Sequence, residues 1–144
     1  MFQYRSDIGY LLNKLNQCAN NQLAKLLRSA GVQDITPGLG RILFVLWEKD
    51  GINMNELAKD TNLDKSTMTN MIDRLEKNGL VRREPDTTDR RGILIKLTEQ
   101  SFAKKEMYEN VAKQLNRRIL AGIDQDNLNT TILVLQKMFD NLQS

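Results

Sequence analysis

The stretch 53–98 limits what this chain of 144 residues can fold into more than any other part of it. Its first half predicts two consecutive helices, at 53–60 and 64–78, separated by a short break. Asp64 is suited to cap the start of the longer helix, and Gly79 can adopt the left-handed backbone that ends it. Two helices joined in this way indicate a helix-turn-helix.

Each of these two helices has an apolar side and a polar side. Asn53 and Glu56, at the start of the first helix, stand at capping-box spacing, with asparagine in the serine or threonine role. The apolar residues recur at helical spacing and predict the inner face: Leu57, Ala58, Leu63, Met68, Met71, Ile72 and Leu75. The longer helix leaves short hydroxyls, an amide and bases outside, which suit a DNA major groove: Lys65, Ser66, Thr67, Thr69, Asn70 and Arg74.

A β-ribbon follows the longer helix. Residues 80–84 and 93–97 are rich in branched apolar residues and predict two strands. The polar segment 85–92 between them is loop-forming and carries Arg90 and Arg91 near its far end. A helix-turn-helix followed by a ribbon with a basic tip predicts a winged helix-turn-helix.

The composition excludes several classes of function. With 40% hydrophobic and 27% charged residues the chain resembles an ordinary globular protein, and a net charge of +3 permits nucleic-acid binding without indicating it. No apolar run approaches about 20 residues and no signal-peptide region is visible, so we expect a cytoplasmic protein without a membrane span. One cysteine excludes an internal disulfide, and the absence of histidine removes the commonest general base and zinc ligand. We therefore expect no enzyme, no metal site and no cofactor.

Three segments resemble the signature of the MarR family of bacterial transcriptional regulators. They read LDKSTMT at 63–69, DRLEKNGLVRR at 73–83, and DTTDRR at 86–91, the last followed by Leu97 and Thr98. The order of the flanking helices also fits, so the resemblance covers essentially the whole chain. It implies a sequence-specific DNA-binding regulator, a repressor that binds a pseudo-palindromic operator in double-stranded DNA as a homodimer. It further implies modulation by a small anionic or phenolic effector.

The expected fold class is mainly α with a small β-ribbon. The resemblance implies one domain over 1–144, with the winged helix-turn-helix at about 36–98 and dimerisation helices at about 4–30 and 99–143. The long apolar stripe of the first helix also favours a dimer, because it exceeds what a small domain needs to cover its own core; an ordinary core helix is the alternative. The buried side of the helix predicted from Thr98 consists of Phe102, Met107, Val111, Leu115, Ile119, Leu120 and Ile123.

Individual residues have two interpretations each. Asn70, where many relatives carry arginine, suits adenine through N6 and N7, or else it merely tolerates DNA nearby. Lys65 is a phosphate clamp or an ordinary solvated lysine. The resemblance implies a wing arginine in the minor groove; we assign Arg90 to the groove, Arg91 to a phosphate or an intramolecular brace, and Asp89 to orienting an arginine. A merely solvated hairpin is the alternative for the wing.

Other functions remain as alternatives. A winged-helix module that binds protein rather than DNA would have a neutral or acidic recognition face, whereas this one carries Lys65, Arg74, Arg90 and Arg91. An enzyme is disfavoured by the missing histidine, phosphate-binding loop and metal-ligand cluster. One branch of the family senses organic hydroperoxides with a first-helix cysteine, but Cys18 is displaced from that position and the assisting tyrosines are absent. We expect Cys18 to act as a small hydrophobe, without redox control.

Overall fold

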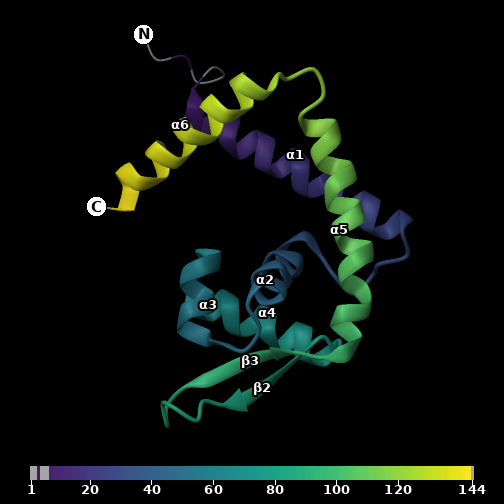
Figure 1. The fold of residues 1–144 in the computed structure, drawn as a ribbon, viewed down its shortest axis with the longest axis vertical. Coiled ribbons are helices and arrows are strands. Elements are labelled where there is room, and N and C mark those ends of the chain that lie inside the picture. Colours follow the sequence, from purple (N-terminus) through teal and green to yellow (C-terminus); the bar gives the residue numbers. More distant parts are fainter. Residues whose placement is uncertain (1–2, 4–6, 144) are drawn as a thin grey trace.

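The structure, a computed structural model, describes residue 3 and residues 7–143. In this part of the chain the order of elements is α1 (Ile8–Ser29), α2 (Pro37–Glu48), β1 (Ile52–Asn53), α3 (Met54–Thr61), α4 (Lys65–Lys77), β2 (Val81–Pro85), β3 (Ile93–Leu97), α5 (Glu99–Ile119) and α6 (Gln125–Gln143). Figure 1 shows α2, α3, α4 and the strands gathered into one body, from which α5 rises toward α1 and α6. The predicted class, mainly α with a small β-ribbon, is confirmed.

The helix-turn-helix forms where the local signals predicted it. Asp64 is the N-cap of α4 and accepts a hydrogen bond of 2.8 Å from the main-chain N–H of Thr67. Gly79, just beyond the C-cap Asn78, has a φ of 76°, a left-handed conformation that glycine adopts without a steric cost. The inner faces of α3 and α4 pack into the core as predicted, with Leu57, Met68, Ile72 and Leu75 buried.

The capping box predicted between Asn53 and Glu56 does not form. Asn53 does cap α3, but it accepts from the main-chain N–H of Asn55 at 2.8 Å, and the Glu56 carboxylate pairs with Lys49 at 3.2 Å. The reason is tertiary: Asn53 also belongs to β1 and pairs with Leu94 of β3, so its backbone is held in the sheet. The glutamate then lies within reach of the lysine that ends α2.

The helix ends deviate from prediction by a few residues. The predicted start of the first helix, Tyr4, lies outside the described residues; α1 begins at Ile8, where Asp7 accepts from the N–H of Gly9 at 3.0 Å. Strand β2 begins and ends one residue later than predicted, and the predicted region 99–143 consists of two helices, α5 ending at Ile119 and α6 beginning at Gln125.

The three strands form one antiparallel sheet in the order β1-β3-β2. Ile52 of β1 and Arg83 of β2 both pair with Ile95 of β3, from opposite sides. Strand β1 therefore adds a short third strand beside the wing. Figure 1 shows β2 and β3 extending from the body as the wing.

Helix α2 is the centre of the body. It is apolar on most sides, and Leu39, Gly40, Ile42, Leu43, Leu46 and Trp47 are buried. Thr36 caps it by accepting from Leu39 N–H at 3.3 Å, and Pro37 occupies the first helical position. Arg41 is exposed and takes no part in the core.

The predicted buried side of α5 is partly wrong. Val111 and Leu115 are buried as expected, but Phe102, Met107, Ile119 and Ile123 are exposed. The other buried residues of this helix are Ser101 and Tyr108. The tyrosine ring sets the rotation of the helix. It lies over the backbone of Gly40 and makes edge contacts with Phe44, with ring centroids 5.0 Å apart. Burial raises the pKa of Tyr108 to about 12, and Arg41 nearby offsets part of that rise.

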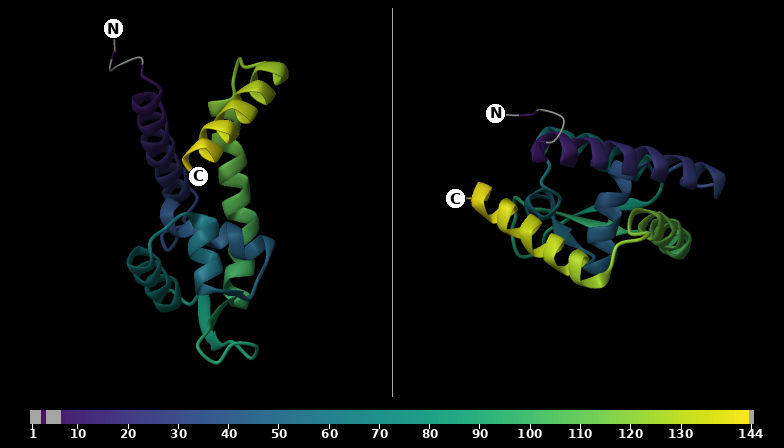
Figure 2. Two further views of the ribbon diagram at one scale, coloured as in Figure 1. Left: turned by 90° about the vertical axis from the view of Figure 1, so that its left-hand side faces the viewer. Right: turned by 90° about the horizontal axis from the view of Figure 1, so that it is seen from above.

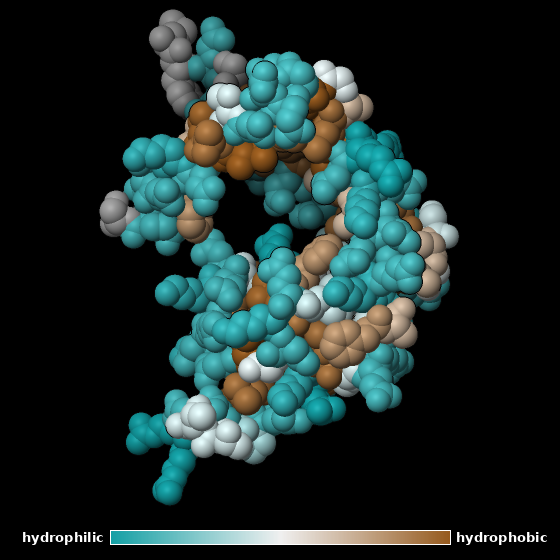
Figure 3. Space-filling model, in the orientation of Figure 1, coloured by the Kyte–Doolittle hydropathy of each residue, from teal (hydrophilic) through white to brown (hydrophobic). Residues whose placement is uncertain are grey.

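The upper helices carry apolar surface that the chain itself does not cover. On α1 the exposed apolar residues are Ile8, Leu11, Leu12 and Leu15, and on α6 they are Ile132, Leu133, Val134, Leu135, Phe139 and Leu142. Figure 2 shows α6 lying apart from the central body, and Figure 3 shows hydrophobic surface in the region of α1 and α6. No helix of the described part is long and apolar enough to cross a bilayer.

The crossing of α2 and α5 predicts a destabilising substitution. An alanine Cβ at position 40 would lie 2.0 Å from the Tyr108 hydroxyl oxygen, so Gly40→Ala must displace the ring. We expect a loss of about 1–3 kcal/mol in the free energy of unfolding, measured by urea denaturation at fixed protein concentration. Gly38→Ala is the control, because its Cβ would meet the end of the flexible Met71 side chain at 3.1 Å and the Thr36 hydroxyl oxygen at 4.0 Å. Equal stability of the two variants would contradict this account of the crossing.

Candidate nucleic-acid interface

The outer face of α4 carries the predicted recognition residues. Ser66, Asn70 and Arg74 follow one another at four-residue steps, and Lys65 and Thr69 form a second row beside them. All five are exposed, whereas the opposite face of the helix is fixed in the core. The fold therefore presents these side chains together on a rigid helix.

Two hydroxyls on this helix already have hydrogen-bond partners within the chain. Thr67, which is half-buried, donates to the Asp64 carboxylate at 2.9 Å, and Thr69 donates to the main-chain oxygen of Lys65 at 2.8 Å. Each hydroxyl proton is thus used, but each oxygen can still accept a hydrogen bond. The exposed Thr69 is suited to accept from an amino group of adenine or cytosine. Thr67 serves chiefly the helix cap, a role that the sequence did not indicate.

The cap at Asp64 makes the start of α4 sensitive to acid. The main-chain N–H and hydroxyl of Thr67 hold the pKa of the Asp64 carboxyl below its ordinary value. Because the folded-state pKa is lowered, the cap contributes stability above the unfolded-state pKa, and this stability is lost as the pH falls through the folded-state pKa. At neutral pH the carboxylate is charged and the helix start is fixed.

Arg83 joins the wing to the recognition helix. Its guanidinium donates to Glu76 at 2.7 Å and to Asp73 at 2.5 Å, so one strand residue bridges two carboxylates of α4. The preceding Arg82 instead pairs with Glu84 of its own strand at 2.7 Å, as the alternation of side chains along a strand requires. Arg83 is therefore occupied as a brace within the chain. The acids at positions 73 and 76 are the signal that could have indicated this.

The tip of the wing is ordered by its own aspartates. Asp86 accepts from the main-chain N–H of Thr88 at 2.9 Å and from its hydroxyl at 2.7 Å, and these bonds lower the pKa of the Asp86 carboxyl. Asp89 accepts from the main-chain N–H of Arg91 at 3.0 Å. Asp89 thus holds an arginine by its backbone rather than by its guanidinium. Arg90 and Arg91 are exposed, and neither forms an ion pair within the described residues.

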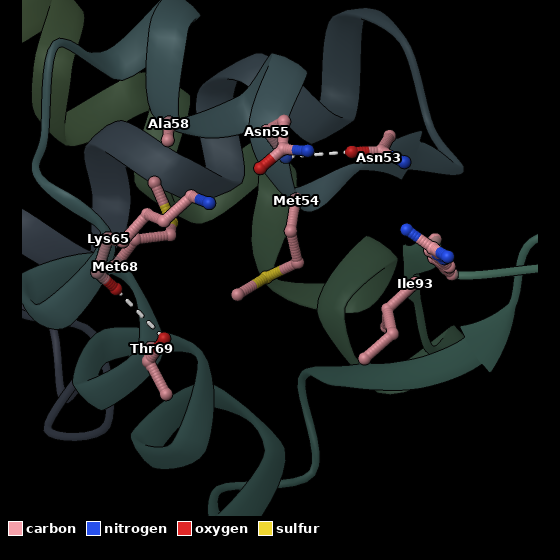
Figure 4. Close-up of a pocket in the computed structure, with 10 residues that line it drawn as sticks. Asn53, Met54, Asn55, Ala58, Lys65, Met68, Thr69 and Ile93 are labelled. Atoms are coloured by element: carbon pink, nitrogen blue, oxygen red, sulfur yellow. Dashed lines mark hydrogen bonds between the residues drawn. The ribbon is translucent and has the colours of Figure 1, made fainter.

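A hollow separates the recognition helix from the wing. It has a volume of about 270 Å³, and its lining comes from α3, from the start of α4 and from the end of the wing loop: Asn53, Met54, Asn55, Ala58, Lys65, Met68, Thr69, Arg91, Gly92 and Ile93. Figure 4 shows the side chains of Met54 and Ile93 extending into it, with Lys65 and Thr69 on the α4 side. The predicted site residues therefore form two groups, one on α4 and one on the wing, and Lys65 and Arg91 border the same hollow.

Comparisons with known proteins agree with this architecture. The sequence profile of the MarR family matches residues 35–93. The multiple antibiotic resistance protein MarR of Escherichia coli is 30% identical over 139 residues, which cover 96% of this chain and 94% of that protein. YdgJ of Bacillus subtilis, an uncharacterized HTH-type transcriptional regulator, is 27% identical over 103 residues, or 72% of this chain and 63% of YdgJ.

Solved structures give the same result. The crystal structure of CouR from Rhodococcus jostii RHA1, bound to p-coumaroyl-CoA, matches with a TM-score of 0.81 at 27% identity over 96% of this chain and 95% of that one. The likeness to E. coli MarR extends over nearly all of both sequences. The chain therefore belongs to the MarR family, whose members are DNA-binding transcriptional regulators and not enzymes.

Proposed function

We propose that this protein is a repressor that binds a pseudo-palindromic operator in double-stranded DNA as a homodimer. The hollow between α4 and the wing is the observation that carries the proposal. A major groove and the minor groove next to it are separated by a single sugar-phosphate strand. If α4 lies in the major groove and the wing reaches that minor groove, the strand between them passes through the hollow, where Lys65 and Arg91 supply positive charge from both sides.

The outer face of α4 would read the bases. Asn70 is suited to a bidentate contact with adenine, and the Thr69 hydroxyl oxygen to an amino group nearby. Ser66 lies one turn before Asn70 and is short enough to sit against the backbone. Arg74, one turn after it, reaches toward a phosphate or a guanine, and the half-buried Thr67 approaches DNA from the helix start.

The wing would contribute in the minor groove. Arg90 lies on the exposed loop beyond the strands, and we assign it to the groove, where a narrow width concentrates negative potential. Arg91, which borders the hollow, is assigned to the phosphate strand. Since Asp89 holds the backbone at position 91, the two arginines leave the loop in a fixed order.

The uncovered faces of α1 and α6 support the homodimer. A chain on its own would leave a row of large apolar side chains in water along both helices, which a second copy can bury. We accordingly divide the chain into a winged helix-turn-helix at about 36–98 and dimerisation helices at about 4–30 and 99–143. A dimer of this kind would cover about two turns of DNA in the cytoplasm, and we propose that it represses by excluding the polymerase from that DNA.

A small anionic or phenolic effector is part of the proposal. The likeness to CouR, whose solved structure contains p-coumaroyl-CoA, a phenolic and anionic molecule, supports this class of ligand. The direct test of the whole proposal is a mobility shift with the DNA upstream of the gene at several salt concentrations. A shift that random DNA of equal length does not reproduce is expected; equal binding to both would contradict sequence-specific regulation.

The dimer interface can be tested on α6. Replacing Ile132 and Leu135 by aspartate places two charges on its uncovered apolar face, so we expect a monomer by sedimentation equilibrium and the loss of operator binding. The control replaces the exposed polar residues Asn129 and Gln136 of the same helix by aspartate. A doubly substituted protein that remains a dimer with full affinity would show that α6 does not form the interface.

Asn70 provides a test of base reading. Asn70→Ala should relax the sequence preference at one position in each half-site, at a cost of about 1–3 kcal/mol if the contact is bidentate. The measurement is the consensus selected from a random DNA library by wild type and variant, with Asn129→Ala as a distant control. An unchanged consensus would mean that Asn70 reads nothing.

The wing arginine should affect affinity more than sequence preference. The logarithm of the binding constant falls as the logarithm of the salt concentration rises, and each lost groove or phosphate contact makes this fall less steep by about 0.9. Because a dimer carries two wings, Arg90→Ala should make it less steep by about 1.8. Salt titrations on operator and on random DNA measure this slope, and Arg117→Ala, with the same loss of charge on α5, serves as control. If the variant has the wild-type slope and the wild-type affinity on both DNAs, Arg90 does not contact DNA.

A further inference from the structure

Asp34 lies where three elements of the fold meet. It belongs to the connection between α1 and α2, yet its partners are 44 and 70 residues away in sequence. The side-chain amide of Asn78, the C-cap of α4, donates to the Asp34 main-chain oxygen at 3.0 Å. The ammonium group of Lys104, in the second turn of α5, pairs with the Asp34 carboxylate. One residue thus contacts both the end of the recognition helix and the start of α5.

The ion pair at this point is partly withdrawn from water. The side chains of Lys104 and Asp34 are 29% and 24% exposed, the lowest pair of values among the ion pairs of the described residues. The second oxygen of the Asp34 carboxylate is buried and has no partner among the described residues. Lys104 therefore supplies the charge compensation on which this carboxylate depends, and its removal would leave a half-buried anion.

These contacts hold a different part of α4 from the part that the core holds. Met68, Ile72 and Leu75 fix the inner face of α4, whereas the Asn78 amide holds only the C-terminal end of the helix. The contacts therefore bear on the direction of the helix axis relative to α5 more than on whether α4 folds. In a dimer with two-fold symmetry any change in that direction occurs twice, so a small tilt alters the separation of the two recognition helices.

We propose that Asp34, Asn78 and Lys104 form a positioning latch that sets the separation of the two recognition helices, and thereby the half-site spacing that the protein accepts. The latch rests on the proposed function, since spacing has meaning only for a dimer on two half-sites. One additional base pair moves a half-site by about 3.4 Å along the DNA and rotates it by about 35° around the axis. A rigid latch must therefore reject DNA with an altered spacer, and a loosened latch must tolerate it better.

The experiment measures spacer preference. Wild-type protein first selects its palindrome from a random duplex library, and the palindrome is then resynthesised with its centre shortened by one base pair or lengthened by one or two. Affinities are measured at one salt concentration for wild type, Lys104→Met and Asn78→Ala. Lys105→Met is the matched control, because it removes the same charge from the next residue of α5, where the lysine pairs with Glu109 of its own helix at 3.9 Å.

The expected result is a loss of discrimination with retained sequence preference. Lys104→Met and Asn78→Ala should each reduce the ratio of affinities between native and altered spacers by about threefold or more, without changing the half-site consensus. Lys104→Arg, which keeps the charge, and Lys105→Met should retain the wild-type ratio. Wild-type ratios in both Lys104→Met and Asn78→Ala would overturn the latch.

A variant of the core distinguishes a specific effect on spacer preference from a general loss of stability. Val111 lies in the buried face of α5, seven residues after Lys104, and Val111→Ala should lower the melting temperature while keeping the wild-type spacer ratio. If Val111→Ala also loses discrimination, the effect is one of stability and the latch is overturned. A wild-type protein that selects no palindrome, or binds all spacers equally, would instead overturn the proposed dimeric DNA binding itself.

Discussion

The contact between Tyr108 and the backbone of Gly40 is the constraint on which the rest of the arrangement depends. It is where α5, which extends to the uncovered upper helices, crosses α2, the centre of the DNA-reading body. Only a residue without a side chain lets the ring approach so closely, and Phe44 and Trp47 close around it with ring centroids 5.0 and 5.7 Å away. The rotation of α5 follows from this contact, and with it the direction in which every other residue of α5 points.

The net charge of the chain does not indicate how acids and bases are arranged near α4 and the wing. The acids there have internal partners: Asp64 binds the helix start, Asp73 and Glu76 share Arg83, and Asp86 and Asp89 hold the wing loop. Lys65, Arg74, Arg90 and Arg91 of the same region are exposed. A region with nearly balanced charge in the sequence thus has acids bound within the chain and these four cations facing outward.

The features that could be predicted from the sequence are those that depend on residues close together in the chain. The cap at Asp64, the left-handed glycine at position 79 and the alternation of Arg82 and Arg83 each follow from interactions within a few residues, and all are present. The partner of Glu56 and the rotation of α5 were missed because tertiary contacts determine them: a sheet pairing of Asn53, and an aromatic ring seated on a glycine of another helix. Periodicity alone favoured the large apolar residues at 102 and 107 over a tyrosine. The recognition residues were placed together on α4 because one helix carries them, whereas the hollow between helix and wing required the fold.

Two of the contacts that α5 makes with the body lie on one side of the helix. Lys104 and Tyr108 are four residues apart and hence about one turn, on the same face of the helix, where one pairs with Asp34 and the other packs on Gly40. A rotation of α5 about its own axis would carry both side chains away from their partners at once, so the body must follow such a rotation or lose both contacts. A ligand that acts by rotating α5 would therefore move the recognition helix of the same chain.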